Sequence, residues 1–301
     1  MKLGQPLKQL SEFRDMVESA LAELSGRRPG RIPQRLWDAM TYSLLAGGKR
    51  VRPVLCLLAG KACGAFLPDI IPMAVACEMV HTASLIHDDL PSMDNDNLRR
   101  GKPTNHVVFG EPLALLAGDA LFLWAFDFAR RGLEERGVFS PQSILDAVGE
   151  LLEASGPFGI CGGQVLDSDP QSFSPTDDHP WNVARAKTAV LIRSSVVSGA
   201  ILGGASGRKR SAFFDFGYHL GTAFQIVDDI IDVTGDESRI GKTPGKDSNQ
   251  GKMTFVAVFG IEKAKQLAAI ETERALEALA RIDGDTSELK LFPEILRERS
   301  C

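Results

Sequence analysis

The sequence predicts an all-α fold built as a single domain over residues 1–301. Apolar residues recur at steps of three and four along nearly the whole chain, whereas the alternation of two that is typical of strands is almost absent. No repeat, low-complexity linker or change of composition divides the chain, and its 44% hydrophobic content is enough for a large core. These observations favour one helical unit.

The helices follow in order from this spacing. Leu7, Leu10, Phe13, Val17, Leu21 and Leu24 fall on one stripe of a first helix, which the glycine- and proline-rich segment 26–33 ends. Residues 70–90 are apolar on most faces, as expected of a helix buried in a bundle. The other predicted helices cover 34–46, 50–63, 111–131, 141–156, 181–203, 211–232, 252–281 and 286–299. Two polar loops, 167–180 and 234–252, separate late helices.

Charge and cysteine usage exclude several classes. A net charge of −5 argues against nucleic acid as a partner. The cysteines show no CxxC pair and no zinc spacing with histidine, which predicts reduced thiols in a cytoplasmic protein. The N-terminus lacks the apolar core of a signal peptide, and no uninterrupted apolar run approaches the roughly 20 residues of a membrane span, so no transmembrane segment is expected.

Two aspartate clusters each follow a predicted apolar helix. The first contains Asp88, Asp89, Asp94 and Asp96, and the second contains Asp228, Asp229 and Asp232. Two carboxylates about 5 Å apart repel by roughly 3 kcal/mol at an effective dielectric near 20, and a helix C-terminus is already negative. Either cluster alone is as typical of a solvated helix end as of a metal site. Both together favour Mg²⁺, which shares carboxylates with substrate phosphates.

Basic residues beside glycine-rich turns supply the groups that bind an anion. They are Lys49, Arg50, Arg52, Arg99, Arg100, Lys187, Lys242, Lys246 and Lys252. Each of them alone is typical of a surface charge. Grouped opposite metal-binding carboxylates, they indicate a diphosphate substrate, because guanidinium and ammonium groups clamp its oxygens while metal ions bridge them.

An ordered set of motifs resembles the trans-isoprenyl diphosphate synthases. The set spans about residues 40–265 and reads GGKRVRP, SLIHDDLPSMDNDNLRRGKPTNH, LAGDAL, GGQVLD, KTAVLIRSSV, FQIVDDIIDVTGD and GKTPGKDSNQGKMTF. The resemblance implies a helical bundle around a deep central cavity, a homodimer, and three Mg²⁺ ions for which Mn²⁺ can substitute. It implies elongation of dimethylallyl, geranyl or farnesyl diphosphate with isopentenyl diphosphate.

The resemblance also assigns roles by motif. The metal ligands would be Asp88, Asp89, Asp94, Asp228, Asp229 and Asp232. Arg99, Lys187, Lys242 and Lys252 would bind the allylic diphosphate, and Lys49, Arg52, His81 and Arg100 the isopentenyl diphosphate. Thr188 and Gln225 would lie near the allylic carbocation, so that Lys187, Thr188 and Gln225 form the catalytic set. Without the motif, His81 is typical of a core histidine. For Gln164 and Asp167, a structural role and substrate contact both stay open.

Product length in this family depends on the floor of a pocket beside the first aspartate motif. Ala83 and Ser84 precede Asp88 by five and four residues, and Ala83 lies roughly 7.5 Å along the helix axis from Asp88. Farnesyl-producing bacterial relatives that share the two-residue insertion in the motif DDLPSMD commonly have an aromatic residue at the position of Ala83. The small side chain favours a geranylgeranyl (C20) product over a farnesyl (C15) one.

Three other functions compete with this interpretation. A terpene cyclase shares the first motif, but usually carries an Asn/Ser/Glu second metal motif and needs no second diphosphate site. A non-catalytic subunit of a synthase usually lacks one aspartate motif, and this chain has both. A two-metal phosphoryl- or nucleotidyl-transfer enzyme is disfavoured because the chain has no P-loop and no strand-borne carboxylate pair.

Overall fold

The computed structural model describes residues 10–168, 178–234 and 252–300, and these form an all-α bundle as predicted. In chain order the elements are α2 (Ser11–Ser25), α3 (Gln34–Leu44), α4 (Val51–Ala62), α5 (Leu67–Asp88), β1 (Leu98–Arg99), β2 (Lys102–Pro103), α6 (Asn105–Phe109), α7 (Glu111–Arg136), α8 (Pro141–Ser155), α9 (Ile160–Ser168), α10 (His179–Val183), η2 (Ala184–Ala189), α11 (Val190–Leu202), α12 (Gly207–Thr234), α15 (Phe255–Phe259), α16 (Ile261–Ala280) and α17 (Ser287–Ser300). The strands β1 and β2 pair antiparallel as a short hairpin.

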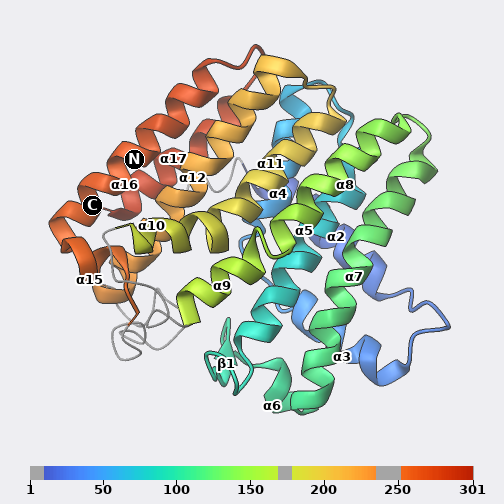
Figure 1. The fold of residues 1–301 in the computed structure, drawn as a ribbon. Helices are drawn as coiled ribbons and strands as arrows, with labels where there is room; N and C mark the ends of the chain where they lie inside the picture. Colours follow the sequence, from blue (N-terminus) through green and yellow to red (C-terminus); the bar gives the residue numbers. More distant parts are fainter. Residues whose placement is uncertain (1–9, 169–177, 235–251, 301) are drawn as a thin grey trace.

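The centre of the bundle is α11, which packs against α4, α5, α8 and α12. Apart from Arg193, every residue of α11 is buried, as expected of a helix that is covered on all sides. The neighbouring α5 is almost as deeply buried and packs against α4 and α7. In Figure 1 the hairpin, α9 and α15 lie at the same end of the bundle. The bundle is therefore centred on the buried α11, and several short elements lie at one end of it.

Local chemistry divides two of the predicted helices. The segment 181–203 is interrupted by η2, a π-helical stretch with a wider turn. The segment 252–281 breaks at Gly260, whose φ of 78° is costly for other residues, so α15 ends there and α16 begins. The short elements β1, β2, α6 and α9 were not predicted, because they are too short to show a period.

The sequence predicts no transmembrane segment, and two long apolar helices of the structure bear on this prediction. By length and composition alone, α5 and α7 are both long and apolar enough to cross a membrane. For α5 the reason is core packing, since 72% of its most apolar window is buried in the bundle. The corresponding share for α7 is 33%, so part of its apolar surface faces outward.

Three loops hold strained backbone. Among the non-glycine residues that the structure describes, positive φ occurs at Arg50 (51°), Asn95 (52°) and Arg100 (55°). Such conformations cost of order 1–3 kcal/mol each and persist where the surroundings enforce them. All three belong to the basic and acidic motifs that the sequence singles out.

Candidate active site

The first aspartate cluster lies where α5 ends. The chain turns back there, so that the N–H of Asp94 donates to the carbonyl of Asp88 at 2.9 Å. The N–H of Asp96 donates to the carbonyl of Asp89 at 3.2 Å. These bonds satisfy carbonyls that a helix end leaves without donors. The turn thereby returns Asp94 to the end of the helix that carries Asp88.

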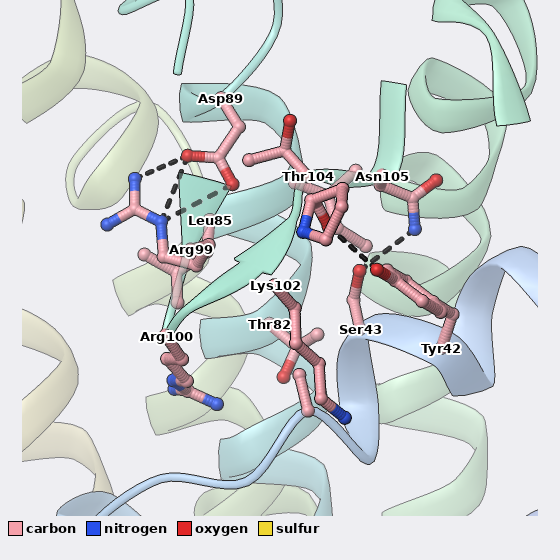
Figure 2. Close-up of a pocket in the computed structure, with 13 residues that line it drawn as sticks. Tyr42, Ser43, Thr82, Leu85, Asp89, Arg99, Arg100, Lys102, Thr104 and Asn105 are labelled. Carbon is pink, nitrogen blue, oxygen red and sulfur yellow. Dashed lines mark hydrogen bonds and ion pairs between the residues drawn. The ribbon is translucent and has the colours of Figure 1, made fainter. Parts of the chain in front are cut away.

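Asp89, the residue that follows α5, is buried and ion-paired. Its carboxylate is 4% exposed and accepts from Arg99 Nε at 3.0 Å and from Arg99 Nη2, as Figure 2 shows. Burial alone would lower the pKa of Arg99, but the pair with Asp89 outweighs it and raises that pKa. Asp89 therefore fixes the guanidinium of Arg99 beside the aspartate turn.

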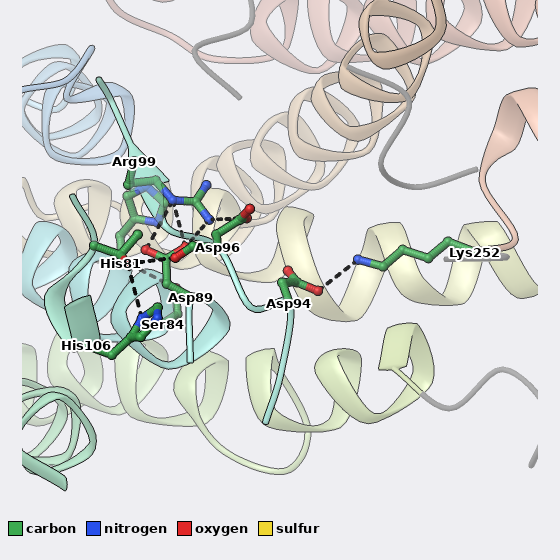
Figure 3. A network of polar contacts seen from close by, with 9 residues as sticks. His81, Ser84, Asp89, Asp94, Asp96, Arg99, His106 and Lys252 are labelled. Carbon is green, nitrogen blue, oxygen red and sulfur yellow. Dashed lines mark hydrogen bonds and ion pairs between the residues drawn. The ribbon is translucent and has the colours of Figure 1, made fainter. Parts of the chain in front are cut away.

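A chain of opposite charges joins the first cluster to later parts of the sequence. Lys187 Nζ lies 2.6 Å from Asp167 Oδ2, and Lys252 Nζ lies 3.3 Å from the same oxygen. Lys252 also donates to Asp94 Oδ1 at 3.2 Å, as Figure 3 shows. Burial would raise the pKa of Asp167, but the two lysines outweigh it and lower that pKa. One carboxylate thus holds two lysines that the motif assigns to diphosphate binding.

The close packing of α9 on η2 makes this bridge possible. A Cβ at Gly163 would lie 2.4 Å from the backbone nitrogen of Lys187, so only glycine lets the two segments approach this closely. Lys187 and Thr188 both belong to η2, and π-helical turns are frequent at functional sites. Gln164 Oε1 is buried and has no hydrogen-bond partner among the described residues. Asp167 Oδ2, one turn later, accepts a hydrogen bond from Lys187 Nζ.

The second aspartate cluster lies at the end of α12, where its members differ in solvent exposure. Asp228 is exposed and Asp232 is half-buried one turn later on the same face. Asp229 is 5% exposed and accepts from Gln225 Nε2 at 2.8 Å and from the N–H of Phe255 at 2.9 Å. Thr188 Oγ1 in turn donates to Gln225 Oε1 at 2.5 Å. The buried carboxylate therefore orients the two polar groups that the motif places near the carbocation.

Arg52, Arg100 and an uncharged His81 form a second, basic group of predicted site residues. Burial lowers the pKa of Arg52, and the carboxylates of Glu78 and Asp228 oppose that shift. Arg52 Nε has no partner among the residues described. Burial, followed by the charges of Arg52 and Arg100, lowers the pKa of His81 well below its usual range. His81 is therefore uncharged at neutral pH, and an incoming anion would favour its protonation.

Shared electrostatic partners relate the two acidic helix ends. The charge of Asp228 in α12 acts on Arg52 at the start of α4. The charges of Asp167 and Asp88 act on Lys187. Burial would lower the pKa of Lys187, but these two carboxylates raise it. Basic side chains are thus within electrostatic range of both clusters, as binding of an anion between them requires.

Comparison with known proteins identifies the fold and its chemistry. The sequence model described as polyprenyl synthetase matches residues 33–290. The chain belongs to this family. It is 46% identical over 260 residues to the large subunit 1 of a chloroplastic heterodimeric geranylgeranyl pyrophosphate synthase from Arabidopsis thaliana, which covers 85% of this chain and 70% of the relative. It is 43% identical over 290 residues to farnesyl diphosphate synthase from Geobacillus stearothermophilus, with 96% of each chain covered.

A solved structure supports the same assignment. The geranyltransferase of Helicobacter pylori, complexed with magnesium and isoprenyl diphosphate, superposes with a TM-score of 0.80 at 30% identity and covers 98% of this chain and 96% of its own. This polyprenyl synthetase is therefore a trans-prenyltransferase that elongates allylic diphosphates with isopentenyl diphosphate. The relatives include both C15 and C20 enzymes, so they do not decide its product.

The carboxylates of this polyprenyl synthetase suit a metal that is shared with substrate. Within the described ranges no group of three or more His, Cys, Asp or Glu side chains could hold a metal ion alone. Mg²⁺ commonly binds one or two carboxylates and completes its octahedron with phosphate oxygens and water. Asp88 with Asp94, and Asp228 with Asp232, offer such pairs at two helix ends. The donor set fits Mg²⁺ that binds together with diphosphate.

The structure places the remaining predicted residues as follows. Ala83 is fully buried, and Ser84 is half-buried with Oγ donating to the His81 carbonyl at 2.9 Å. Lys49 is exposed at the tip of its loop. Lys242 lies outside the described residues. Sequence reasoning missed Glu78, because a single acidic residue within an apolar helix shows no motif spacing.

Proposed function

We propose that this prenyltransferase makes geranylgeranyl diphosphate by condensing isopentenyl diphosphate with allylic diphosphates. The assignment of the substrate site rests on the bridge of Asp94, Lys252, Asp167 and Lys187, which gathers cationic groups beside the first acidic helix end. The C20 product rests on Ala83, whose methyl group adds little bulk to α5 five residues before Asp88. A C15 product is the alternative.

In this proposal the two aspartate clusters hold Mg²⁺ jointly with the allylic diphosphate. Asp88 would bind from the end of α5, Asp94 from the turn that follows it, and Asp228 and Asp232 from α12. The proposal has three ions in total, with Mn²⁺ able to replace them. When bound, the metal supplies positive charge that stabilises the leaving diphosphate. Asp89 and Asp229 bind nitrogen donors in this structure, so we assign them to positioning Arg99 and Gln225.

Lysine and arginine side chains then bind the diphosphate oxygens. Lys187 and Lys252 exchange part of their contact with Asp167 for the substrate, and Arg99 approaches from the aspartate turn. Because these groups are fixed before substrate arrives, they stabilise charge that develops as the allylic C–O bond breaks. Lys242, which the motif assigns to the allylic diphosphate, would join them.

The second substrate, isopentenyl diphosphate, binds at the group that contains Arg52 and Arg100. Lys49, Arg52, His81 and Arg100 hold isopentenyl diphosphate so that its double bond faces the allylic cation, while Thr188 and Gln225 direct oxygen dipoles toward that cation. The new C–C bond forms between them, and a proton leaves the resulting cation for the released diphosphate. A cavity between the two helix ends would exclude the water that quenches the cation.

Direct assay tests this function. Purified protein is incubated with Mg²⁺, labelled isopentenyl diphosphate and, separately, dimethylallyl, geranyl or farnesyl diphosphate. We expect C20 product from all three starters, including farnesyl diphosphate, and no product when a chelator removes Mg²⁺. Failure to extend farnesyl diphosphate would contradict the C20 assignment. Cyclisation without isopentenyl diphosphate would point to a terpene cyclase.

We also propose a homodimer built on α7 and α8. Leu116 and Leu123 on α7, and Leu145 and Leu152 on α8, are each seven residues apart and are 55%, 74%, 66% and 55% exposed. The two helices pack against each other, so these leucines extend over adjoining surfaces. Exposed apolar patches of this kind mark protein interfaces, and a second copy of the chain is the occupant we propose.

The double variant Leu123→Arg/Leu152→Arg is expected to run as a monomer, because charged side chains would be buried unpaired in the interface. Light scattering coupled to size exclusion should give about twice the 32.6 kDa chain mass for the natural protein and about once for the variant. The matched control is Ile270→Arg on α16, also exposed at 45%, which should stay dimeric. A natural protein that is monomeric at micromolar concentration would contradict the proposal.

We place the enzyme in the cytoplasm. The four cysteines that the structure describes, Cys56, Cys63, Cys77 and Cys161, are free thiols, which suits a reducing compartment. The burial of most of α5 inside the bundle agrees with this placement.

A further inference from the structure

Glu78 is a buried carboxylate in the middle of the apolar helix α5. The residue is 1% exposed, and Oε1 lies 2.5 Å from Arg50 Nη1 and 4.0 Å from Arg100 Nη2. Its charge also opposes the lowered pKa of Arg52. A buried carboxylate is costly unless it is paired, and here three arginines from two motifs surround one such group.

Through Arg50, Glu78 fixes the loop that precedes α4. Arg50 also donates from Nε to Glu18 Oε1 at 2.8 Å and from Nη2 to the carbonyl of Leu44 at 2.9 Å. Its own backbone has a φ of 51°, which is unfavourable for arginine without such anchoring. The side chain of Arg50 therefore faces the interior, whereas the motif assigns its neighbours Lys49 and Arg52 to substrate binding.

The same carboxylate faces Arg100 across this loop. Arg100 Nη1 donates to the carbonyl of Gly47, and its guanidinium lies against Gly48, where an added Cβ would be 2.9 Å from Cζ. Arg100 has a φ of 55° and follows the aspartate turn. The loop before α4 and the loop after α5 are thus locked together through one buried anion.

The cluster gathers three guanidiniums, those of Arg50, Arg52 and Arg100, around a few carboxylates. Glu18 pairs directly with Arg50 alone, and Asp228 acts on Arg52 through its charge. The buried Nε of Arg52 has no partner within the described part of the chain. A buried donor without a partner, beside two further guanidiniums, is an arrangement that an anionic ligand completes.

We propose that Glu78 is a positioning residue for the isopentenyl diphosphate site, holding Arg50 and Arg100 so that Arg52 and Arg100 meet the diphosphate in fixed geometry. This inference rests on the proposed location of that site. Glu78 touches arginines and no substrate, so it acts through them. Its role is geometric, since its negative charge by itself disfavours binding of an anion.

The sign of the effect separates geometry from charge. Glu78→Gln removes a negative charge, so a purely electrostatic role predicts a lower KM for isopentenyl diphosphate. Positioning predicts the opposite: a KM for isopentenyl diphosphate raised by about tenfold, with kcat and the KM for the allylic diphosphate within about twofold of the natural values. Glu78→Asp keeps the charge but shortens the reach, so it should raise the same KM.

Controls make each outcome decisive. Glu271→Gln on α16 removes another buried carboxylate, one that pairs with His219 and Arg274 outside this cluster, and should leave the KM for isopentenyl diphosphate within about twofold. If Glu78→Gln fails to fold, the paired variant Arg50→Gln/Glu78→Gln leaves no unpaired charge at this contact and should show the same raised KM.

An unchanged or lowered KM for isopentenyl diphosphate in the folded variants would overturn the positioning role. An equal loss for both substrates would overturn it too, by showing a general structural defect. These results differ from failure of the proposed function, in which the natural protein itself would form no elongated product.

Discussion

Asp88→Ala and Asp228→Ala are each expected to lower kcat by at least about a thousandfold while the helical bundle stays folded. Each change removes one of the paired carboxylates at a helix end, so the leaving diphosphate loses the positive charge that the metal would supply. Asp228 is exposed and Asp88 half-buried, so neither change opens a cavity in the core. Steady-state kinetics with circular dichroism would measure both effects.

Asp215→Asn serves as the matched control. Asp215 lies on the same helix as Asp228, about 20 Å from it along the helix axis at 1.5 Å per residue, and pairs with Arg281 at the surface. Its turnover should equal that of the natural protein. Near-natural rates in both Asp88→Ala and Asp228→Ala would rule out the proposed metal ligands.

Ala83→Phe is expected to change the main product from C20 to C15. A phenyl ring adds bulk to α5 between one and two turns before Asp88, where the growing chain would need space. Because Ala83 has no exposed surface, the ring also overpacks its surroundings, and the melting temperature should fall by several degrees. Chromatography of the dephosphorylated products from geranyl diphosphate gives the ratio.

Ser84→Phe provides the comparison that locates the pocket floor. On a helix with 100° per residue, Ser84 lies about 40° from Asp88 and Ala83 about 140° from it. A shift to C15 with Ala83→Phe alone would place the floor on that side of α5, whereas a shift with Ser84→Phe alone would move it to the Asp88 face. No shift in either variant would show that residues on another helix set the length.

Most helices were predictable because helical periodicity is a local property. The stripe along α2 and the apolar run of α5 are visible without any knowledge of their neighbours. The break at Gly260 was harder, since the flanking residues keep a helical pattern on both sides. The π-helical turn η2 depends on packing against α9 and α12, and no spacing in the segment 181–203 revealed it.

In the candidate site, too, the sequence motif does not distinguish residues of the same type that the fold places in different surroundings. The motif treated Asp88, Asp89, Asp228 and Asp229 alike. Their surroundings separate them, because Asp89 is buried against Arg99 and Asp229 against Gln225 and Phe255. Lys252 was one basic residue among several in a polar segment, and only folding brought it to Asp94 and Asp167.

The sequence by itself determined that the chain is helical, that acidic motifs end two of its apolar helices, and that it resembles prenyl diphosphate synthases. Each of these follows from the order of neighbouring residues. The tertiary structure alone decided which carboxylates are buried with nitrogen donors, which lysines share Asp167, and which arginines Glu78 holds. The reason is physical: burial and charge pairing depend on distances between segments far apart in the chain, and packing sets those distances.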